Sequence, residues 1–327
     1  MKEFNTFQRY FIEEFYDDYR EGLISRRTFI RRLAFITGSM TSVAAAMALV
    51  GCQPAELPAA TEPMPEPETP AAGGTVPSAP APGPVPDAQS PLSVPEGDPD
   101  LITEEVTYAS QDAEVMAYLA RPAATGSINP AVLVCHENRG LTPHIRDVAR
   151  RFAKEGYVAL APDLLSREGG TAALDRDAIP GLLSNAAPER HVADFQAGYD
   201  YLQGLEFVDG ARIAMNGYCF GGGVTWRCAT SIAGLKAAAP FYGPAPDLDQ
   251  VPNIQAAIFA AYAELDERIN ASIPALEEAL QAAGVTYEIK IYPGVNHAFH
   301  NDTGERYDET QALQAWRDML GWFAAHV

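Results

Sequence analysis

The apolar positions between residues 101 and 327 follow two alternating patterns. Short continuous apolar runs, such as residues 131–135, are typical of strands that are buried on both faces of a sheet. Longer stretches with an apolar residue every three to four positions, such as residues 145–155, are typical of amphipathic helices. These patterns predict strands at 115–119, 131–135, 157–161, 212–215, 237–241, 256–262 and 287–292, and helices at 145–155, 191–205, 223–230, 272–283 and 309–325.

The order of these elements predicts the fold class. Strands alternate with helices, and repeated βα units form a mostly parallel, twisted sheet with helices on both faces. We therefore expect one α/β domain over residues 101–327. In such a sheet, functional side chains gather at the carboxyl ends of the strands.

The segment before this domain has a different composition. Residues 53–100 hold 14 of the 26 prolines and eight acidic residues, with no Lys or Arg. They contain almost no large apolar side chains, so they cannot bury enough surface to offset chain entropy. We expect a disordered linker here.

Residues 1–52 resemble a bacterial export signal. Arg26 and Arg27 precede an apolar stretch at residues 33–50, as in a twin-arginine signal. This stretch ends in Leu-Val-Gly-Cys, which resembles a lipobox, where the signal is cleaved before the cysteine and the cysteine is acylated. The resemblance implies lipidation of Cys52 and an exported, membrane-tethered protein at the periplasmic or extracytoplasmic face. An uncleaved membrane anchor and a buried helix are alternatives for the apolar stretch, and the acidic, aromatic leader at residues 1–24 has no place in any of these interpretations.

Charge and hydropathy exclude several functional classes. The formal net charge of -20 argues against non-specific nucleic-acid binding, which needs a basic face to neutralise phosphates. A mean hydropathy of -0.11 argues against a polytopic membrane protein. Four cysteines are too few for a disulfide scaffold in a chain of 327 residues. The chain carries no glycine-rich phosphate loop, and we expect neither a cofactor nor a metal.

A candidate nucleophile lies between the predicted strand at 212–215 and the predicted helix at 223–230. Residues 217–221 read Gly-Tyr-Cys-Phe-Gly, a G-x-nucleophile-x-G turn with cysteine in place of serine. Glycine is needed at both ends because the sharp turn leaves no room for a Cβ. Cys219 would project near a helix N-terminus, which favours a thiolate, and the N–H of Phe220 would receive an oxyanion. The alternative is a glycine-rich turn with a buried structural cysteine.

Two later residues fit the same catalytic arrangement. Asp266 follows the predicted strand at 256–262, and His297 follows the predicted strand at 287–292. The chain order of nucleophile, acid and histidine is the order that the α/β-hydrolase fold requires. We expect His297 to act as the base for Cys219, while Asp266 orients the imidazole.

Residues 101–327 resemble the dienelactone hydrolase family, which has the α/β-hydrolase fold. The resemblance rests on four motifs: His-Glu-Asn-Arg-Gly at 136–140, Tyr-Val-Ala-Leu-Ala-Pro-Asp-Leu at 157–164, Gly-Tyr-Cys-Phe-Gly-Gly at 217–222 and the Gly-x-x-His-x-Phe run at 294–299. It implies that Glu137 interacts with the Cys219 thiol at rest and that the N–H of Asn138 completes the oxyanion hole. The implied reaction is attack of Cys219 on an ester or lactone carbonyl, followed by hydrolysis of the thioester.

The sequence says less about the substrate. The family places an arginine shortly after the catalytic histidine to bind a substrate carboxylate, whereas this chain reads Phe-His-Asn-Asp at 299–302. Arg139 and Arg167 are the candidate cations instead. Thioesterase or dehalogenase chemistry, and a non-catalytic binding module on the same fold, are the alternative functions.

Overall fold

The structure is a computed structural model that describes residues 4–51, 85–124 and 126–327, with only the backbone described at residues 40 and 41. Cys52 and residues 53–84 of the predicted linker lie outside the described residues. The catalytic part of the chain and the N-terminal helices are therefore both open to description.

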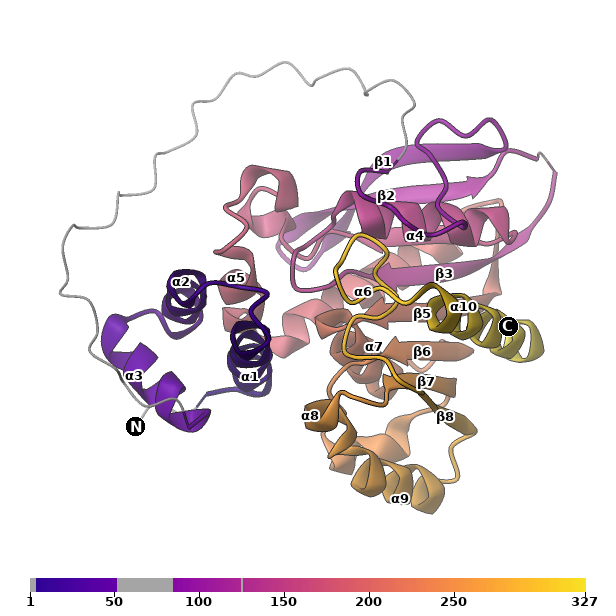
Figure 1. Ribbon diagram of the computed structural model, residues 1–327. Helices are drawn as coiled ribbons and strands as arrows, with labels where there is room; N and C mark the ends of the chain where they lie inside the picture. The colour runs from indigo at the N-terminus through magenta and orange to yellow at the C-terminus, as the bar shows by residue number, and fades with distance from the viewer. Residues whose placement is uncertain (1–3, 52–84, 125) are drawn as a thin grey trace.

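Eight strands in the described residues form one sheet, in the order β1-β2-β4-β3-β5-β6-β7-β8 (Figure 1). The strands are β1 (Leu101–Ser110), β2 (Ala113–Pro122), β3 (Asn129–Cys135), β4 (Val158–Pro162), β5 (Val208–Tyr218), β6 (Ala237–Phe241), β7 (Ala257–Ala263) and β8 (Tyr287–Tyr292). Neighbours from β4 to β8 pair in parallel, whereas β2 pairs antiparallel with both β1 and β4. The predicted α/β-hydrolase sheet, mostly parallel, is confirmed.

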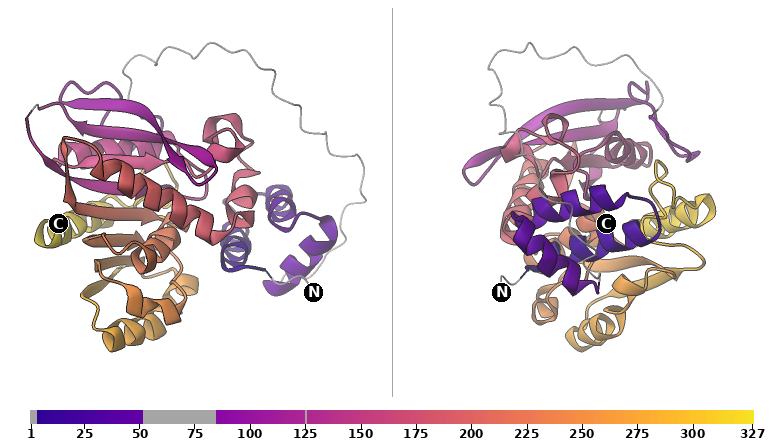
Figure 2. Two further views of the ribbon diagram at one scale, coloured as in Figure 1. Left: turned by 180° about the vertical axis from the view of Figure 1, so that it is seen from behind. Right: turned by 60° about the vertical axis from the view of Figure 1, so that its left-hand side comes forward.

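Helices cover both faces of this sheet. Helices α4 (Pro143–Lys154) and α10 (Glu309–His326) pack on one face, in front in Figure 1. Helices α6 (Pro188–Gln203) and α7 (Phe220–Ser231) pack on the other, seen from behind in Figure 2. The shorter elements are α5 (Ile179–Asn185), α8 (Glu267–Asn270), α9 (Ile273–Ala283) and the 3₁₀ turns Ser166–Glu168, Thr171–Ala173 and Leu248–Asn253. The core lies between these layers, where every residue of β4, β6 and β7 is buried.

Three further helices precede the domain. They are α1 (Thr6–Arg20), α2 (Arg26–Thr37) and α3 (Met40–Leu49), and α1 and α2 pack against α5. The left view of Figure 2 shows this group to one side of the sheet, and the right view shows it in front of the domain. Its contact with Cys219, at the end of β5, places it where the functional side chains were expected. No single helix in the described residues has the length and apolar character to cross a membrane, but α2 and residues 42–49 satisfy that test together, as a pair bent by 112°.

The last part of the predicted linker is held against the domain. The Ser90 N–H donates to the Asp302 carboxylate at 3.0 Å, and the Val94 N–H donates to the Asp147 carboxylate at 2.6 Å. Val94 is itself buried. The prediction of disorder is therefore wrong for residues 85–100, because buried carboxylates of the domain satisfy the backbone N–H groups of this segment.

Candidate active site

The chain turns sharply at Cys219, between the end of β5 and the start of α7. Cys219 has a φ of 59° and a ψ of -121°, a backbone conformation that residues other than glycine rarely adopt. A Cβ on Gly221 would lie 2.5 Å from the His136 carbonyl oxygen, so the second flanking position admits only glycine. A Cβ on Gly217 would overlap the backbone of Gly221 in the same way. The structure confirms the tight turn that the Gly-x-Cys-x-Gly motif predicts.

His297 and Asp266 converge on this turn from the ends of β8 and β7. The Nδ1 of His297 lies 2.6 Å from Oδ2 of Asp266, and both side chains are buried. Burial alone would raise the pKa of Asp266, but the charge and hydrogen bond of His297 outweigh it and lower that pKa below its usual value. Asp266 is also the N-cap of α8, which fixes its orientation. The carboxylate is therefore held ionised against the imidazole, and the second ring nitrogen faces the site.

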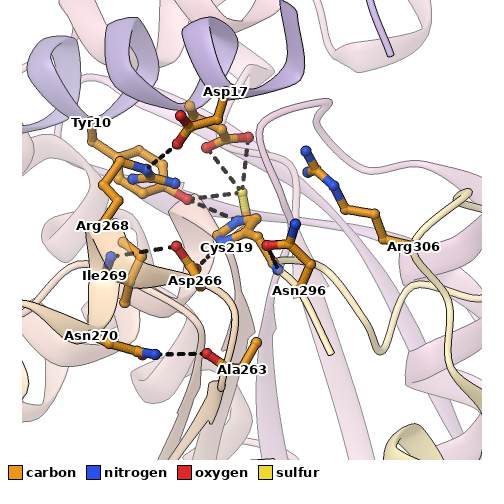
Figure 3. Close-up of polar contacts among 12 residues, drawn as sticks. Tyr10, Asp17, Cys219, Ala263, Asp266, Arg268, Ile269, Asn270, Asn296 and Arg306 are labelled. Atoms are coloured by element: carbon orange, nitrogen blue, oxygen red, sulfur yellow. Dashed lines mark hydrogen bonds and ion pairs between the residues drawn. The ribbon is translucent and has the colours of Figure 1, made fainter. Parts of the chain in front are cut away.

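An N-terminal side chain contacts both the thiol and the imidazole. The hydroxyl of Tyr10, on α1, donates to the Cys219 Sγ at 3.2 Å and lies 3.3 Å from Nε2 of His297 (Figure 3). The Cys219 thiol in turn donates to both carboxylate oxygens of Glu14, at 3.6 Å each. Glu14 also accepts a hydrogen bond of 2.5 Å from the side chain of Asn138. Helix α1 thus contributes two polar groups to the centre of the site.

The Cys219 thiol is only 3% exposed. Burial raises its pKa well above the usual value, and the charges of Glu14 and Glu137 raise it further. Hydrogen bonds from the Tyr10 hydroxyl and the Phe220 N–H act in the opposite direction. With α1 in place, the surroundings favour the neutral thiol, which is the weaker nucleophile.

Glu137 differs from its expected role. Its carboxylate accepts a hydrogen bond of 2.5 Å from the side chain of Asn301, and Glu14 of the leader takes the place against the thiol that we had expected for Glu137. The charge of Glu137 still lies near enough to Cys219 to raise the pKa of its thiol. The resemblance covers residues 101–327 only, so it could not predict a carboxylate that residues 1–24 supply.

A model of the dienelactone hydrolase family matches residues 115–327. The chain belongs to this family. A protein of Methylorubrum extorquens named "Putative carboxymethylenebutenolidase" is 34% identical over 236 residues, which cover 68% of this chain and 81% of the relative. A Synechocystis protein of the same name is 33% identical over 244 residues, covering 70% and 98%. The crystal structure of a "Putative Dienelactone Hydrolase" from Klebsiella pneumoniae superposes with a TM-score of 0.64 at 33% identity, covering 68% and 98%.

This member of the dienelactone hydrolase family has a cavity of about 810 Å³ beside the catalytic turn. Cys219, His297, Glu137 and Asn138 line it, together with side chains of α1 and the segment after it. Arg139 also lines it and is exposed, as a substrate-contacting cation would be.

Arg167, the second cation that the sequence offered, lies elsewhere. Its guanidinium donates to both carboxylate oxygens of Asp194, at 2.9 and 2.7 Å, and to the carbonyl of Ser110. It does not line the cavity at Cys219. Arg167 therefore joins α6 to the β1–β2 hairpin, and its proposed contact with substrate is withdrawn.

The site also has the geometry of a small metal-ligand group. Glu14, Cys219 and His297 each offer one ligand atom, and these atoms lie within 4.8 Å of one another. A cysteine and histidine at this separation are equally what nucleophilic catalysis requires, since the imidazole must reach the thiol proton. The spacing therefore does not by itself indicate a metal.

The sequence patterns did not place Tyr10 or Glu14 in the site. A signal was present, because Phe7, Tyr10, Phe11 and Phe15 recur at the spacing of one helix face. That spacing predicts a helix with an apolar side, but it does not say which surface covers the side.

Proposed function

We propose that this chain hydrolyses a carboxylic ester or lactone through a Cys219 nucleophile. The observation that carries the proposal is the arrangement of Cys219 on a strained turn beside a His297–Asp266 pair joined at 2.6 Å. The relatives in Methylorubrum and Synechocystis carry the name "Putative carboxymethylenebutenolidase", which agrees with a lactone as substrate.

The reaction follows from the residues present. His297 accepts the thiol proton of Cys219, and the sulfur attacks the carbonyl carbon of the substrate. The N–H groups of Phe220 and Asn138 receive the oxyanion. The C–O bond breaks, and the His297 imidazolium gives its proton to the leaving oxygen. Water, deprotonated by His297, then cleaves the thioester and returns the thiol together with a carboxylic acid.

Hydrolysis of p-nitrophenyl acetate tests this proposal. Cys219→Ala removes the atom that forms the thioester, so we expect activity to fall by about a thousandfold or more. Cys228→Ala is the matched control, because Cys228 is a buried cysteine on α7, the helix that begins directly after Cys219. Activity of the Cys219→Ala protein near that of the control would contradict the proposal.

A panel of substrates separates the neighbouring chemistries. Thioesters, haloalkanoic acids and lactones all place a carbon within reach of the same nucleophile, so the triad does not choose among them. We expect lactones and activated esters to be hydrolysed faster than the others. No turnover of any of them, together with failure of iodoacetamide to label Cys219 selectively, would favour a non-catalytic binding module if both results also hold in the Phe11→Asp variant described below.

We also propose that the protein is exported and acylated at Cys52, on the strength of the paired arginines and the lipobox-like residues before it. The linker would then hold the domain away from a membrane surface. Incorporation of radiolabelled palmitate in the bacterial host should be lost in Cys52→Ser. Incorporation that survives the substitution would overturn this proposal.

A further inference from the structure

Helix α1 covers the catalytic centre of its own chain, and this arrangement goes beyond the proposed function. The Tyr10 hydroxyl contacts both the Cys219 Sγ and Nε2 of His297, at 3.2 and 3.3 Å. Proton transfer from thiol to imidazole requires these two atoms to interact directly or through the substrate. A hydroxyl fixed against both atoms competes with that transfer and with a substrate.

The apolar face of α1 is anchored on the residue after the nucleophile. The rings of Phe7 and Phe11 pack on the ring of Phe220, with centroids 4.8 and 5.5 Å apart. Phe7 is 1% exposed and Phe11 is fully buried. Burial of two aromatic side chains gives the docked helix a strong apolar contact. The contact also places α1 over the turn at Cys219 rather than over a remote surface.

The acidic side of α1 faces cations at the rim of the site. Asp18 pairs with Arg306 at 2.9 Å, and Asp17 pairs with Arg268 at 3.4 Å. The Arg268 guanidinium also lies 4.7 Å from the centre of the Tyr10 ring (Figure 3). The leader and the catalytic edge are thus complementary in charge as well as in shape.

Helix α1 lies outside the part of the chain that the family model matches. That model begins at residue 115, and 98% of the Klebsiella chain is covered by 68% of this one. Helix α1 therefore packs on a domain whose family match does not extend to it.

We propose that α1 is an intramolecular inhibitor, and that the catalytic face is a docking surface for the acidic, aromatic leader of the same chain. The chain that retains residues 1–51 is latent, because Tyr10 and Glu14 occupy the site that an ester carbonyl would enter. Release of α1 exposes Cys219 and frees His297. The proposed cleavage before Cys52 would remove α1 together with the signal, so latency would last until export.

The rate at which iodoacetamide alkylates Cys219 in the full chain tests this inference. Phe11→Asp places a charge in the contact with Phe220, and we expect alkylation of the Cys219 peptide to quicken about tenfold or more. Arg9→Ala is the matched control, since Arg9 is exposed on the same helix and should leave the rate unchanged. Equal rates in wild type and Phe11→Asp would overturn the proposal.

A second set of variants, which swaps the charges of residues 18 and 306, tests the same inference if the Phe11→Asp protein does not fold. Asp18→Arg should quicken alkylation by repelling Arg306, and the double variant Asp18→Arg with Arg306→Asp should slow it again. Failure of the second substitution to restore the slow rate would contradict specific docking.

Hydrolysis by the same variants distinguishes the two proposals. Faster alkylation with no ester hydrolysis in Phe11→Asp would support the proposal that α1 covers the site and contradict the proposed hydrolase function. The opposite relation, slower hydrolysis once α1 is displaced, would mean that Tyr10 and Glu14 assist the chemistry, and it would overturn inhibition.

Discussion

The N-terminal helices and the catalytic domain bury their apolar side chains equally well, but against different partners. In the domain, strands such as β4 and β7 are buried among elements of the same 227 residues that the sheet organises. In the leader, Phe11 is just as buried, yet its ring lies against Phe220 at the catalytic turn. The leader side chains join the same buried cluster as the domain, but the strands are paired and covered within residues 101–327, whereas the packing of α1 depends on the functional edge of the domain.

Burial alone therefore does not distinguish a structural helix from an inhibitory one. The distinction lies in what the helix covers. A change in the domain core should lower stability, while a change at the leader interface should alter access to Cys219 with little effect on the domain.

The largest effect on stability is expected from Gly221→Ala. The new Cβ would lie 2.5 Å from the His136 carbonyl and 2.6 Å from that of Cys135, so the end of β3 must shift. We expect a cost of at least about 2 kcal/mol, which lowers Tm by roughly 4–8 °C. Gly321→Ala on α10 is the control, because nothing lies within 4 Å of its Cβ position. A melting temperature equal to that of the control would contradict the packing described for the turn.

Gly181→Ala should affect the N-terminal helices and the catalytic domain differently. Gly181 lies on α5, and a Cβ there would come within 2.7 Å of the Phe35 backbone on α2. This clash lies between α5 and α2, outside the sheet. We therefore expect it to displace the leader helices and to quicken alkylation of Cys219 several-fold. Melting of the domain should stay close to that of Gly321→Ala. A large loss of stability with no change in alkylation would show that the leader is part of the domain core.

His191 gives the interface a dependence on pH. It is fully buried beside Phe7 and Phe220, and burial lowers its pKa to about 3 despite the hydrogen bond to the Leu183 carbonyl. The unfolded chain binds a proton below about pH 6.5 while the folded chain does not. Stability is therefore complete above this pH and falls as the pH drops towards 3, by roughly 1.4 kcal/mol per unit.

Unfolding by denaturant between about pH 6.5 and pH 5 measures this slope. His191→Gln keeps an N–H donor for Leu183 and has no charge to gain, so its stability should vary less with pH. Equal slopes in the two proteins would mean that His191 is not held neutral at the interface.

Salt should have the smallest effect. The pair between Arg306 and Asp18 is partly exposed, and so is the pair between Arg268 and Asp17. Screening near 1 M NaCl should weaken both and quicken alkylation of Cys219 by about two- to fivefold. Iodoacetamide is neutral, so its own approach is unaffected. Asp18→Asn should respond less to salt, and an equal response would exclude Asp18 from the docking contact.

Much of the domain could be predicted because the patterns that mark its strands and turns involve residues close together in the sequence. A continuous apolar run gave β6 its observed bounds, and alternation of apolar and charged residues gave those of β8. The flanking glycines marked the turn at Cys219. The convergence of Asp266 and His297 followed from chain order and from their places after strands. These features need no knowledge of distant partners, since parallel strands all end at the same edge.

The remaining features depend on contacts between distant parts of the chain. Strand β1 was missed because most of its positions are exposed or half-buried, which leaves no continuous apolar run. Arg167 was placed at the substrate because its partner, Asp194, lies 27 residues further along. Glu14 reaches Cys219 across 205 positions, and no periodicity in either segment reports such a contact.

Mass measurements on the intact protein and its peptides, after brief mixing with p-nitrophenyl acetate, test both proposals at once. A Cys219 nucleophile covered by α1 predicts an acetyl group on the peptide that carries Cys219 in the Phe11→Asp protein, far less of it in the wild-type full chain, and none when Phe11→Asp is combined with Cys219→Ala. An acetyl group that forms on Cys219 equally fast in wild type and Phe11→Asp would contradict inhibition by α1. Turnover of the ester without acetylation that depends on Cys219 would contradict the proposed nucleophile.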